Sequence, residues 1–198
     1  MIVKNEGKII CRLLESVLPI IDSYCICDTG STDDTVNIIK QFFQESGISG
    51  KIVTESFRDF GYNRTFALQQ CQNLENADYI LLIDADMILW VNPAIHIKDF
   101  KDSLTRDIYH VFQGSDAFYY KNVRLIKNRP GVSYWGVTHE FLQTPPDTVI
   151  KQLDKSLLFV DDIGDGGAKG DKFQRDIRLL SQGLEENPAM FLMIRTFL

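Results

Sequence analysis

The first half of the chain alternates between two spacings of its apolar residues. Apolar side chains that recur every three or four positions predict amphipathic helices, at residues 6–17, 33–45 and 63–74. Short apolar runs between these segments predict strands, at residues 1–3, 24–27, 51–55 and 79–83. Strands that alternate with helices of this length are typical of βαβ units, so the pattern predicts an α/β fold with a mostly parallel central sheet.

After residue 86 the pattern changes to shorter apolar runs. These runs predict a smaller half with strands of mixed direction, at residues 109–113, 123–126 and 141–143. A loop rich in glycine and aspartate follows at residues 161–167, and helical spacing returns at residues 171–186. The chain contains no internal repeat and no linker-like segment, so we expect a single domain over residues 1–198.

Composition narrows the possible functions. A length of 198 residues, with 44% hydrophobic and 24% charged residues, suits one well-filled globular domain. The net charge of −6 argues against sequence-independent nucleic-acid binding, which needs a basic surface. No apolar stretch reaches the roughly 18 residues that span a bilayer, and the N-terminus lacks a signal-peptide pattern. The four cysteines form no C-x-x-C pair, which favours a reducing, cytoplasmic location.

The segment Asp84-Ala85-Asp86 follows the apolar run at residues 79–83. In an extended backbone, residues i and i+2 point to the same side, so both carboxylates can converge on one ligand. Two anionic oxygen donors suit Mg²⁺ or Mn²⁺, which also bind phosphate oxygens. The alternative is a solvated turn whose acidic residues cap a helix, and this motif alone does not decide between the two.

Two more polar segments follow predicted strands, namely residues 4–6 and 28–33. Ligands of parallel sheets bind beyond the carboxyl ends of the strands, so the three segments together predict a nucleotide or phosphate site. For residues 28–33 a structural role stays open, because Gly30 permits a tight turn, Ser31 can cap the next helix and Asp33 favours its positive end. The chain has no G-x-G-x-x-G segment at this position and no G-K-[ST] phosphate loop.

Five segments in order resemble the motifs of family 2 glycosyltransferases: Met1-Ile2-Val3-Lys4-Asn5-Glu6, Asp28-Thr29-Gly30-Ser31-Thr32-Asp33, Asn63-Arg64, Asp84-Ala85-Asp86 and Trp135-Gly136-Val137-Thr138-His139-Glu140. The resemblance implies a single GT-A (Rossmann-like) domain, in which residues 1–90 bind the nucleotide and residues 91–198 form the acceptor side. It also implies a UDP-sugar donor (glucose by default), a Mn²⁺ or Mg²⁺ ion, and inversion at the anomeric carbon.

The resemblance assigns contacts with the nucleotide and the donor sugar to twelve residues: Val3, Asn5, Glu6, Asp28, Gly30, Ser31, Asp33, Asn63, Arg64, Asp84, Ala85 and Trp135. Within this set, Asp28 would accept the imide N–H of uracil, and Asp84 would face the ribose or the donor sugar. Asp86 would bind the metal directly. A surface ion pair on a helix is an equally simple explanation for Arg64.

An inverting transfer needs a base that takes the proton of the acceptor hydroxyl, and Glu140 is the candidate. Asp116 is the rival candidate, although it also suits an ordinary turn. His139 could complete the coordination of the metal or touch the diphosphate. Trp135 could be a platform for a sugar or a core residue, and the sequence leaves both open.

Several departures from the family pattern keep alternatives open. Many relatives have a histidine in the region of the loop at residues 161–171, and this chain has none, so the third metal ligand is undetermined. The apolar segment at residues 190–198 could pack on the core or form a homodimer surface. The alternatives are a non-catalytic nucleotide-sugar binder and, with less support, a sugar nucleotidyltransferase. The acceptor could be a glycan, a protein or a lipid.

Overall fold

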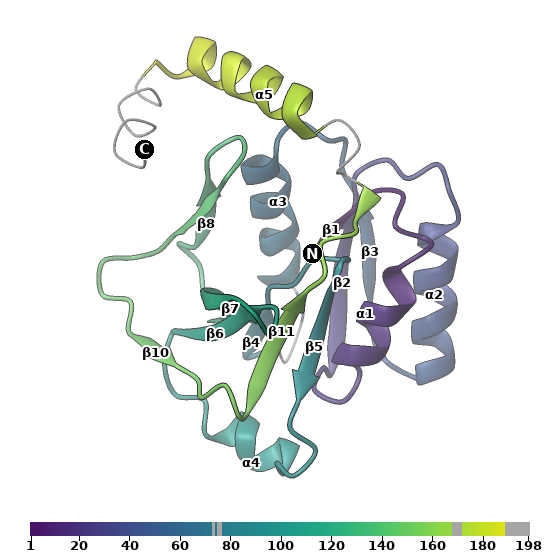
Figure 1. Ribbon diagram of the computed structural model, residues 1–198, viewed down its shortest axis with the longest axis vertical. Coiled ribbons are helices and arrows are strands. Elements are labelled where there is room, and N and C mark those ends of the chain that lie inside the picture. The colour runs from purple at the N-terminus through teal and green to yellow at the C-terminus, as the bar shows by residue number, and fades with distance from the viewer. Residues whose placement is uncertain (73, 75–76, 168–171, 189–198) are drawn as a thin grey trace.

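The computed structural model describes residues 1–72, 74, 77–167 and 172–188 of the chain (Figure 1). Its elements follow one another in the order β1 (Ile2–Val3), α1 (Ile10–Val17), β2 (Ser23–Asp28), α2 (Thr35–Ser46), β3 (Ser49–Thr54), α3 (Phe60–Gln72), β4 (Tyr79–Leu81), β5 (Met87–Val91), α4 (Ile97–Asp102), β6 (Ile108–Gly114), β7 (Tyr119–Lys127), β8 (Ser133–Trp135), β9 (Phe141–Gln143), β10 (Ile150–Gln152), β11 (Leu158–Asp162) and α5 (Lys172–Glu186).

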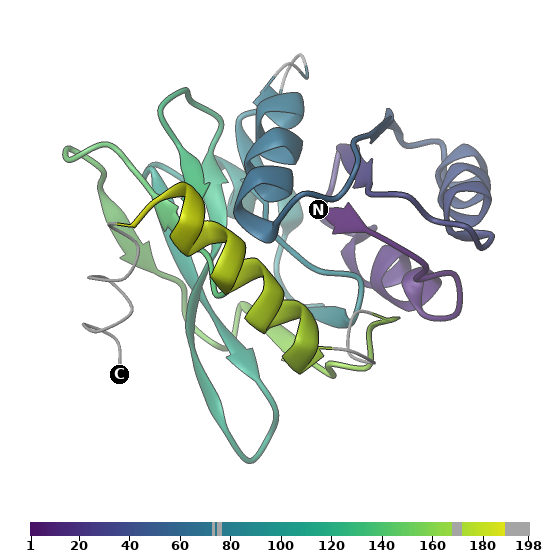
Figure 2. The same cartoon turned by 90° about the horizontal axis from the view of Figure 1, so that it is seen from above.

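The first three strands form a parallel sheet in the order β1-β2-β3. Helix α1 connects β1 to β2, and helix α2 connects β2 to β3. Both helices lie on the same side of this sheet, and α3 lies on the other side (Figures 1 and 2). Because β1 and β2 are parallel neighbours, with Val3 opposite Asp28, the loops after them lie at one edge. This edge is where the first two polar segments of the sequence meet.

The second sheet is mixed, with the order β4-β7-β6-β11-β5 and β10 paired with β6. The expected α/β fold is therefore confirmed, with its parallel strands concentrated in the first sheet. The strand predicted at residues 79–83 forms as β4, but it pairs antiparallel with β7 rather than with the parallel strands. Strands β8 and β9 form a separate hairpin.

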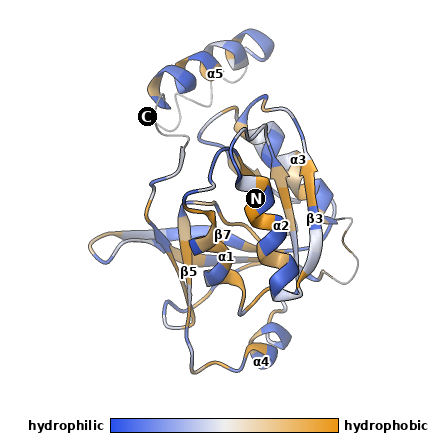
Figure 3. Ribbon diagram, turned by 90° about the vertical axis from the view of Figure 1, so that its right-hand side faces the viewer, coloured by the Kyte–Doolittle hydropathy of each residue, from blue (hydrophilic) through white to orange (hydrophobic). Residues whose placement is uncertain are grey.

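Buried apolar residues of the two sheets and α1 form one cluster, and Figure 3 colours the apolar residues orange along the ribbon. Leu13 and Leu14 of α1 are fully buried, as are Val111 of β6 and Val160 of β11. A cavity of about 500 Å³ lies between the sheets, and its lining includes residues of β2, β4 and α3 but none of the predicted site residues. The candidate chemistry is therefore separate from this cavity.

Two helices begin at different residues from those that the periodicity predicts. Helix α1 begins only at Ile10, and residues 7–9 form a turn before it. The N–H of Glu6 donates to the Thr35 hydroxyl at 2.8 Å, and the oxygen of Glu6 accepts from the N–H groups of Ile9 and Ile10. Helix α3 begins at Phe60, where the Asp59 carboxylate accepts a hydrogen bond from the N–H of Tyr62 at 2.7 Å. This is the geometry of an N-cap.

Helix α5 lies at one end of the molecule, over the β8–β9 hairpin and the start of α3 (Figure 2). Its Asp176 accepts a hydrogen bond from Thr138, and its Glu186 pairs with Arg58 at 2.9 Å. The apolar segment at residues 190–198 lies outside the described residues, so the homodimer stays a prediction. Among the helices of the described residues, none has the length and apolar character needed to cross a lipid bilayer.

Candidate functional site

The loops after β1 and β2 are fastened to each other by side chains. Asn5 has a positive φ of 57°, which asparagine adopts more readily than most residues. Its N–H donates to Ser31 Oγ at 3.0 Å, and its side-chain oxygen accepts from the N–H of Thr32 at 2.7 Å. The two polar segments that the sequence analysis grouped therefore form one surface.

The same interlocking continues one residue further along each loop. Asp33 accepts hydrogen bonds from the N–H groups of Gly7 and Thr35, both at 3.1 Å. These bonds hold its pKa below the ordinary value, the hydrogen bond from the Thr35 hydroxyl being the largest cause. Asp33 thus stabilises the start of α2, and its carboxylate accepts hydrogen bonds from backbone N–H groups.

Asp28 ends β2, and its side chain closes the turn that follows. Its carboxylate accepts from the N–H groups of Gly30, at 3.3 Å, and Ser31, at 3.1 and 3.2 Å. Gly30 has a φ of 106°, a value that side-chain-bearing residues rarely adopt. The turn suits the structural role that the sequence left open for these residues. A uracil contact of Asp28 stays a prediction.

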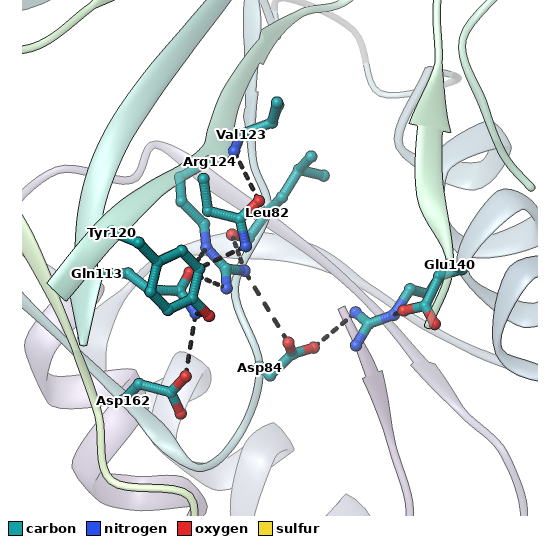
Figure 4. Close-up of polar contacts among 10 residues, drawn as sticks. Leu82, Asp84, Gln113, Tyr120, Val123, Arg124, Glu140 and Asp162 are labelled. Carbon is teal, nitrogen blue, oxygen red and sulfur yellow. Dashed lines mark hydrogen bonds and ion pairs between the residues drawn. The ribbon is translucent and has the colours of Figure 1, made fainter. Parts of the chain in front are cut away.

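Asp84 lies between two arginines from different elements (Figure 4). Arg64 of α3 donates through Nη1 to Oδ1 at 2.6 Å, and Nη1 of Arg124, on β7, is 3.9 Å from Oδ2. Burial alone would raise the pKa of Asp84, but the charge and hydrogen bond of Arg64, with help from Arg124, lower it to about 2. Asp84 is thus a firmly ionised, oriented carboxylate.

Glu140 reaches the same arginine from the β8–β9 hairpin. Its Oε1 lies 2.6 Å from Nε of Arg64, and its side chain is only 14% exposed. One guanidinium therefore joins the first carboxylate of the Asp84-Ala85-Asp86 motif to the candidate base. The sequence predicts Arg64 at the donor or in a surface ion pair, and in the structure it forms this half-buried bridge.

Arg124, Gln113, Tyr120 and Asp162 are four site residues that the sequence analysis missed (Figure 4). The Gln113 side chain accepts from Arg124 and donates to Tyr120 Oη at 2.7 Å and to Asp162 Oδ2 at 3.0 Å. The available signal was a single charged residue, Arg124, inside the apolar run at residues 123–126. A buried charge in a strand needs a partner.

Asp86 and Glu6 carry negative charge that their surroundings compensate poorly. Burial raises the pKa of Asp86, and the charges of Asp84 and Asp162 raise it further. Burial also raises the pKa of Glu6, against the lowering effect of a hydrogen bond from Gly167, and Asp86 adds to the rise. Such carboxylates are the ligands that Mg²⁺ and Mn²⁺ prefer, so the chemistry of the donor set fits a divalent cation.

The described residues bring fewer metal ligands together than the sequence predicts. Within the part of the chain that the structure describes, no group of three His, Cys, Asp or Glu residues is arranged to hold a metal ion. The His139 side chain, expected as a second ligand, is 74% exposed, and its Nε2 lies 3.9 Å from the Asp176 carboxylate of α5. Asp86 is thus a candidate ligand without the expected partner.

The loop after β11 lies directly on these two carboxylates. The N–H of Gly164 donates to the backbone oxygen of Asp86 at 3.3 Å, and the N–H of Gly167 donates to the Glu6 carboxylate at 3.1 and 3.2 Å. A Cβ on Gly166 would lie 3.1 Å from Oδ2 of Asp86. The glycines therefore allow the loop backbone to approach the acidic residues closely.

Three residues that are predicted to contact the donor have almost no exposed surface, and their donor contacts stay predictions. Val3 and Ala85 are 3% and 5% exposed and belong to the core. Asn63 is fully buried, and its amide bonds to the backbone of Arg58 and Ser56 at 2.9 and 3.0 Å. The side chains of Val3 and Ala85 pack in the core, and the amide of Asn63 bonds to the backbone.

The two remaining candidates are Trp135 and Asp116. Trp135 ends β8, and its ring lies 5.5 Å from that of Phe141 across the hairpin, which leaves both the platform and the packing role open. Asp116 lies in the exposed turn between β6 and β7. Among the contacts of the described residues, none links Asp116 to Asp84 or Asp86. The geometry therefore favours Glu140 over Asp116.

Comparison with known proteins places these features in context. The profile of a family described as glycosyl transferase family 2 matches residues 1–148. An uncharacterized glycosyltransferase of Rickettsia felis is 33% identical over 113 residues, which are 57% of this chain and 36% of that protein. A TPR repeat-containing protein of Synechococcus elongatus is 28% identical over 146 residues, 72% of this chain and 34% of that protein.

The curated relatives are much longer than the chain, which spans 36% and 34% of these two. Among solved structures, S. aureus TarS (residues 1–349) is similar with a TM-score of 0.44 and 20% identity, over 58% of this chain and 35% of that one. A second crystal structure of TarS is a complex with UDP.

Proposed function

Because this chain belongs to glycosyl transferase family 2, we propose that it transfers a sugar from a UDP-sugar donor to an acceptor hydroxyl, with inversion at the anomeric carbon. The observation that carries the proposal is the bridge of Arg64 between Asp84 and Glu140. It brings a carboxylate suited to the donor and a carboxylate suited to the acceptor to opposite ends of one guanidinium. Glucose is the default sugar.

The donor side is formed by the interlocked loops after β1 and β2 and by Asp84. Hydrogen bonds within the protein hold these loops together, so little ordering entropy should be lost when a nucleotide binds. Asn5 is exposed and Ser31 half-buried at this edge, while the buried Glu6 carboxylate accepts from the N–H of Gly167. We assign the uridine to this surface and the ribose or donor sugar to Asp84.

On the acceptor side, Glu140 takes the proton from the attacking hydroxyl. Its contact with Nε of Arg64 holds one carboxylate oxygen and leaves the other for the acceptor. A general base must lie within hydrogen-bond reach of the proton that it takes, and an oriented carboxylate meets this demand better than a freely rotating one. The ion pair with Arg64 supplies that orientation.

A divalent cation, Mn²⁺ or Mg²⁺, would be held by Asp86. His139 would serve as the second ligand only after its exposed side chain turned away from Asp176. When bound, the ion would neutralise charge on the diphosphate leaving group. The protein's own contribution is the excess negative charge at Asp86 and Glu6, which favours cation binding at this edge.

The test is metal-dependent release of UDP from a panel of UDP-sugars, combined with thermal shift measurements. UDP with Mn²⁺ should raise the melting temperature more than UDP alone, and Asp86→Ala should remove this difference. The exposed Glu15 of α1 offers a control, since Glu15→Gln should change neither result. UDP binding without release of UDP from any donor would instead indicate a non-catalytic nucleotide-sugar binder.

A further inference from the structure

Arg124 is a buried cation in the otherwise apolar run at residues 123–126 of β7. It is 6% exposed, and its guanidinium makes two sets of contacts. Nη1 donates to the backbone oxygen of Leu82 at 3.1 Å, and Nε donates to Oε1 of Gln113 at 2.8 Å, with Nη2 on the same oxygen. Both partners are uncharged, so these bonds orient the guanidinium without neutralising it.

The charge of Arg124 is neutralised by Asp84. Among the ion pairs of the described residues, the contact of its Nη1 with Oδ2 of Asp84, at 3.9 Å, is the only one that Arg124 makes. An unpaired charge taken out of water costs several kcal/mol. The contact with Asp84 should therefore stabilise the buried guanidinium even at 3.9 Å. Asp84 is thus shared by two cations.

The sharing creates a balanced group of four charges. Arg64 and Arg124 supply two positive charges, and Asp84 and Glu140 supply two negative ones. The Asp84 carboxylate turns Oδ1 to Arg64 and Oδ2 to Arg124, so it offers a single oxygen to each guanidinium. Arg64 consequently keeps its Nε side for Glu140.

This arrangement differs from the pairing that arginine and carboxylate prefer when left alone. An isolated pair favours two parallel N–H···O bonds between the guanidinium and both carboxylate oxygens. If Arg124 were absent, Asp84 could rotate to make that bidentate pair with Arg64. Glu140 would then compete with Asp84 for one guanidinium and lose its fixed position.

We propose that Arg124 is a positioning residue for the proposed reaction, which holds Asp84 so that Arg64 stays available to orient Glu140. The inference rests on the proposed function for its kinetic consequence, but the geometry of the four charges exists independently of any activity. Gln113 and the oxygen of Leu82 fix the guanidinium of Arg124 in turn. No contact of Arg124 with a substrate is required.

The test compares Arg124→Met and Arg124→Lys with Arg129→Met as a matched control. Arg129 is a partly buried arginine that pairs with Asp107 at 3.4 Å, outside the four-charge group. Arg124→Met should lower kcat about tenfold, corresponding to about 1.4 kcal/mol, and should weaken UDP binding by a clearly smaller factor. Arg124→Lys, which keeps the charge near Asp84, should recover part of kcat.

A second measurement separates this inference from the proposed function. Labelling of carboxylates with a carbodiimide and an amine, mapped by mass spectrometry, reports how freely Glu140 is exposed. Glu140 should be labelled several-fold faster in Arg124→Met than in the wild type or in Arg129→Met. If no UDP-sugar supports transfer by the wild type, the proposed function fails, and the labelling still decides the positioning role.

Two results would overturn the inference. One is an unchanged labelling rate of Glu140 in folded Arg124→Met. The other is a loss of UDP affinity as large as the loss of kcat, without recovery in Arg124→Lys, since that pattern indicates a general loss of structure. Circular dichroism of each variant establishes that the folded state is being compared.

Discussion

Two carboxylates that are two residues apart should affect stability in opposite directions. We expect Asp84→Asn to destabilise the metal-free protein at pH 7 and Asp86→Asn to stabilise it or leave it unchanged. The reason lies in their partners. Asp84 is held between two guanidinium groups, whereas Asp86 is buried beside the charges of Asp84 and Asp162.

The magnitude for Asp84 follows from its pKa, which falls from 3.8 to about 2 on folding. This shift corresponds to about 2 kcal/mol of stability at pH 7. Because the folded pKa lies below the unfolded one, the stabilisation is present above about pH 4 and is lost as the pH falls towards 2. The substitution also leaves two buried guanidinium groups short of a counter-charge, so about 2 kcal/mol is a lower bound at pH 7.

Asp86 has the reverse sign. Its pKa is raised, so its protonated form is favoured in the folded state, and ionisation weakens the fold as the pH rises through the folded pKa. An asparagine at this position removes the unfavourable charge at pH 7. In the presence of a divalent cation the benefit should disappear, because the cation would bind the wild-type carboxylate and not the amide.

The assay is urea unfolding of the wild type, Asp84→Asn and Asp86→Asn in EDTA, at several pH values from 7 to 3. The destabilisation of Asp84→Asn should shrink to roughly half of its neutral value near pH 3. Equal destabilisation by the two substitutions would refute the electrostatic reasoning. So would a loss in Asp84→Asn that does not change with pH.

Three further substitutions test how the site is supported. Gly61→Ala should destabilise the fold by several kcal/mol in thermal unfolding, because a Cβ there would lie 2.3 Å from the backbone oxygen of Gly136; a melting temperature within about 2 °C of the wild type would contradict this close approach. Asn63→Ala should cost about 2–3 kcal/mol through the loss of its buried amide bonds, and a neutral effect would show that water replaces them. Arg12→Gln breaks an exposed pair with Asp165 at 2.6 Å, so global stability should change by less than about 1 kcal/mol while hydrogen exchange in residues 162–167 speeds up; unchanged exchange would show that the pair does not hold the loop.

The first half of the fold could be predicted from the sequence because its signals are local. The apolar spacing of residues 24–27 and 33–45 found β2 and α2 to within a few residues. The start of α3 escaped prediction, since it depends on the Asp59 cap rather than on periodicity. Strand β5 was missed because its partner, β11, lies about 70 residues away and no local turn joins them.

In the candidate site, too, the residues with local signals could be predicted and those brought together by distant strands could not. Interlocking of the loops at Asn5 and Ser31 followed from their places after parallel strands. Arg124 and Gln113 could not be found in this way, because strands β6 and β7 bring them to Asp84 only through the register of the mixed sheet. The burial of Asn63 was equally hidden, since a polar residue at a helix start is exposed more often than not.

Whether this chain transfers sugars with Glu140 as the base is decided most directly by single-turnover release of UDP at saturating donor and acceptor, with Glu140→Gln beside Asp116→Asn. We predict that Glu140→Gln binds UDP with wild-type affinity and loses transfer by a factor of about 100 or more, whereas Asp116→Asn retains it. An active Glu140→Gln variant, or an inactive Asp116→Asn variant with intact UDP binding, would contradict the assignment of the base.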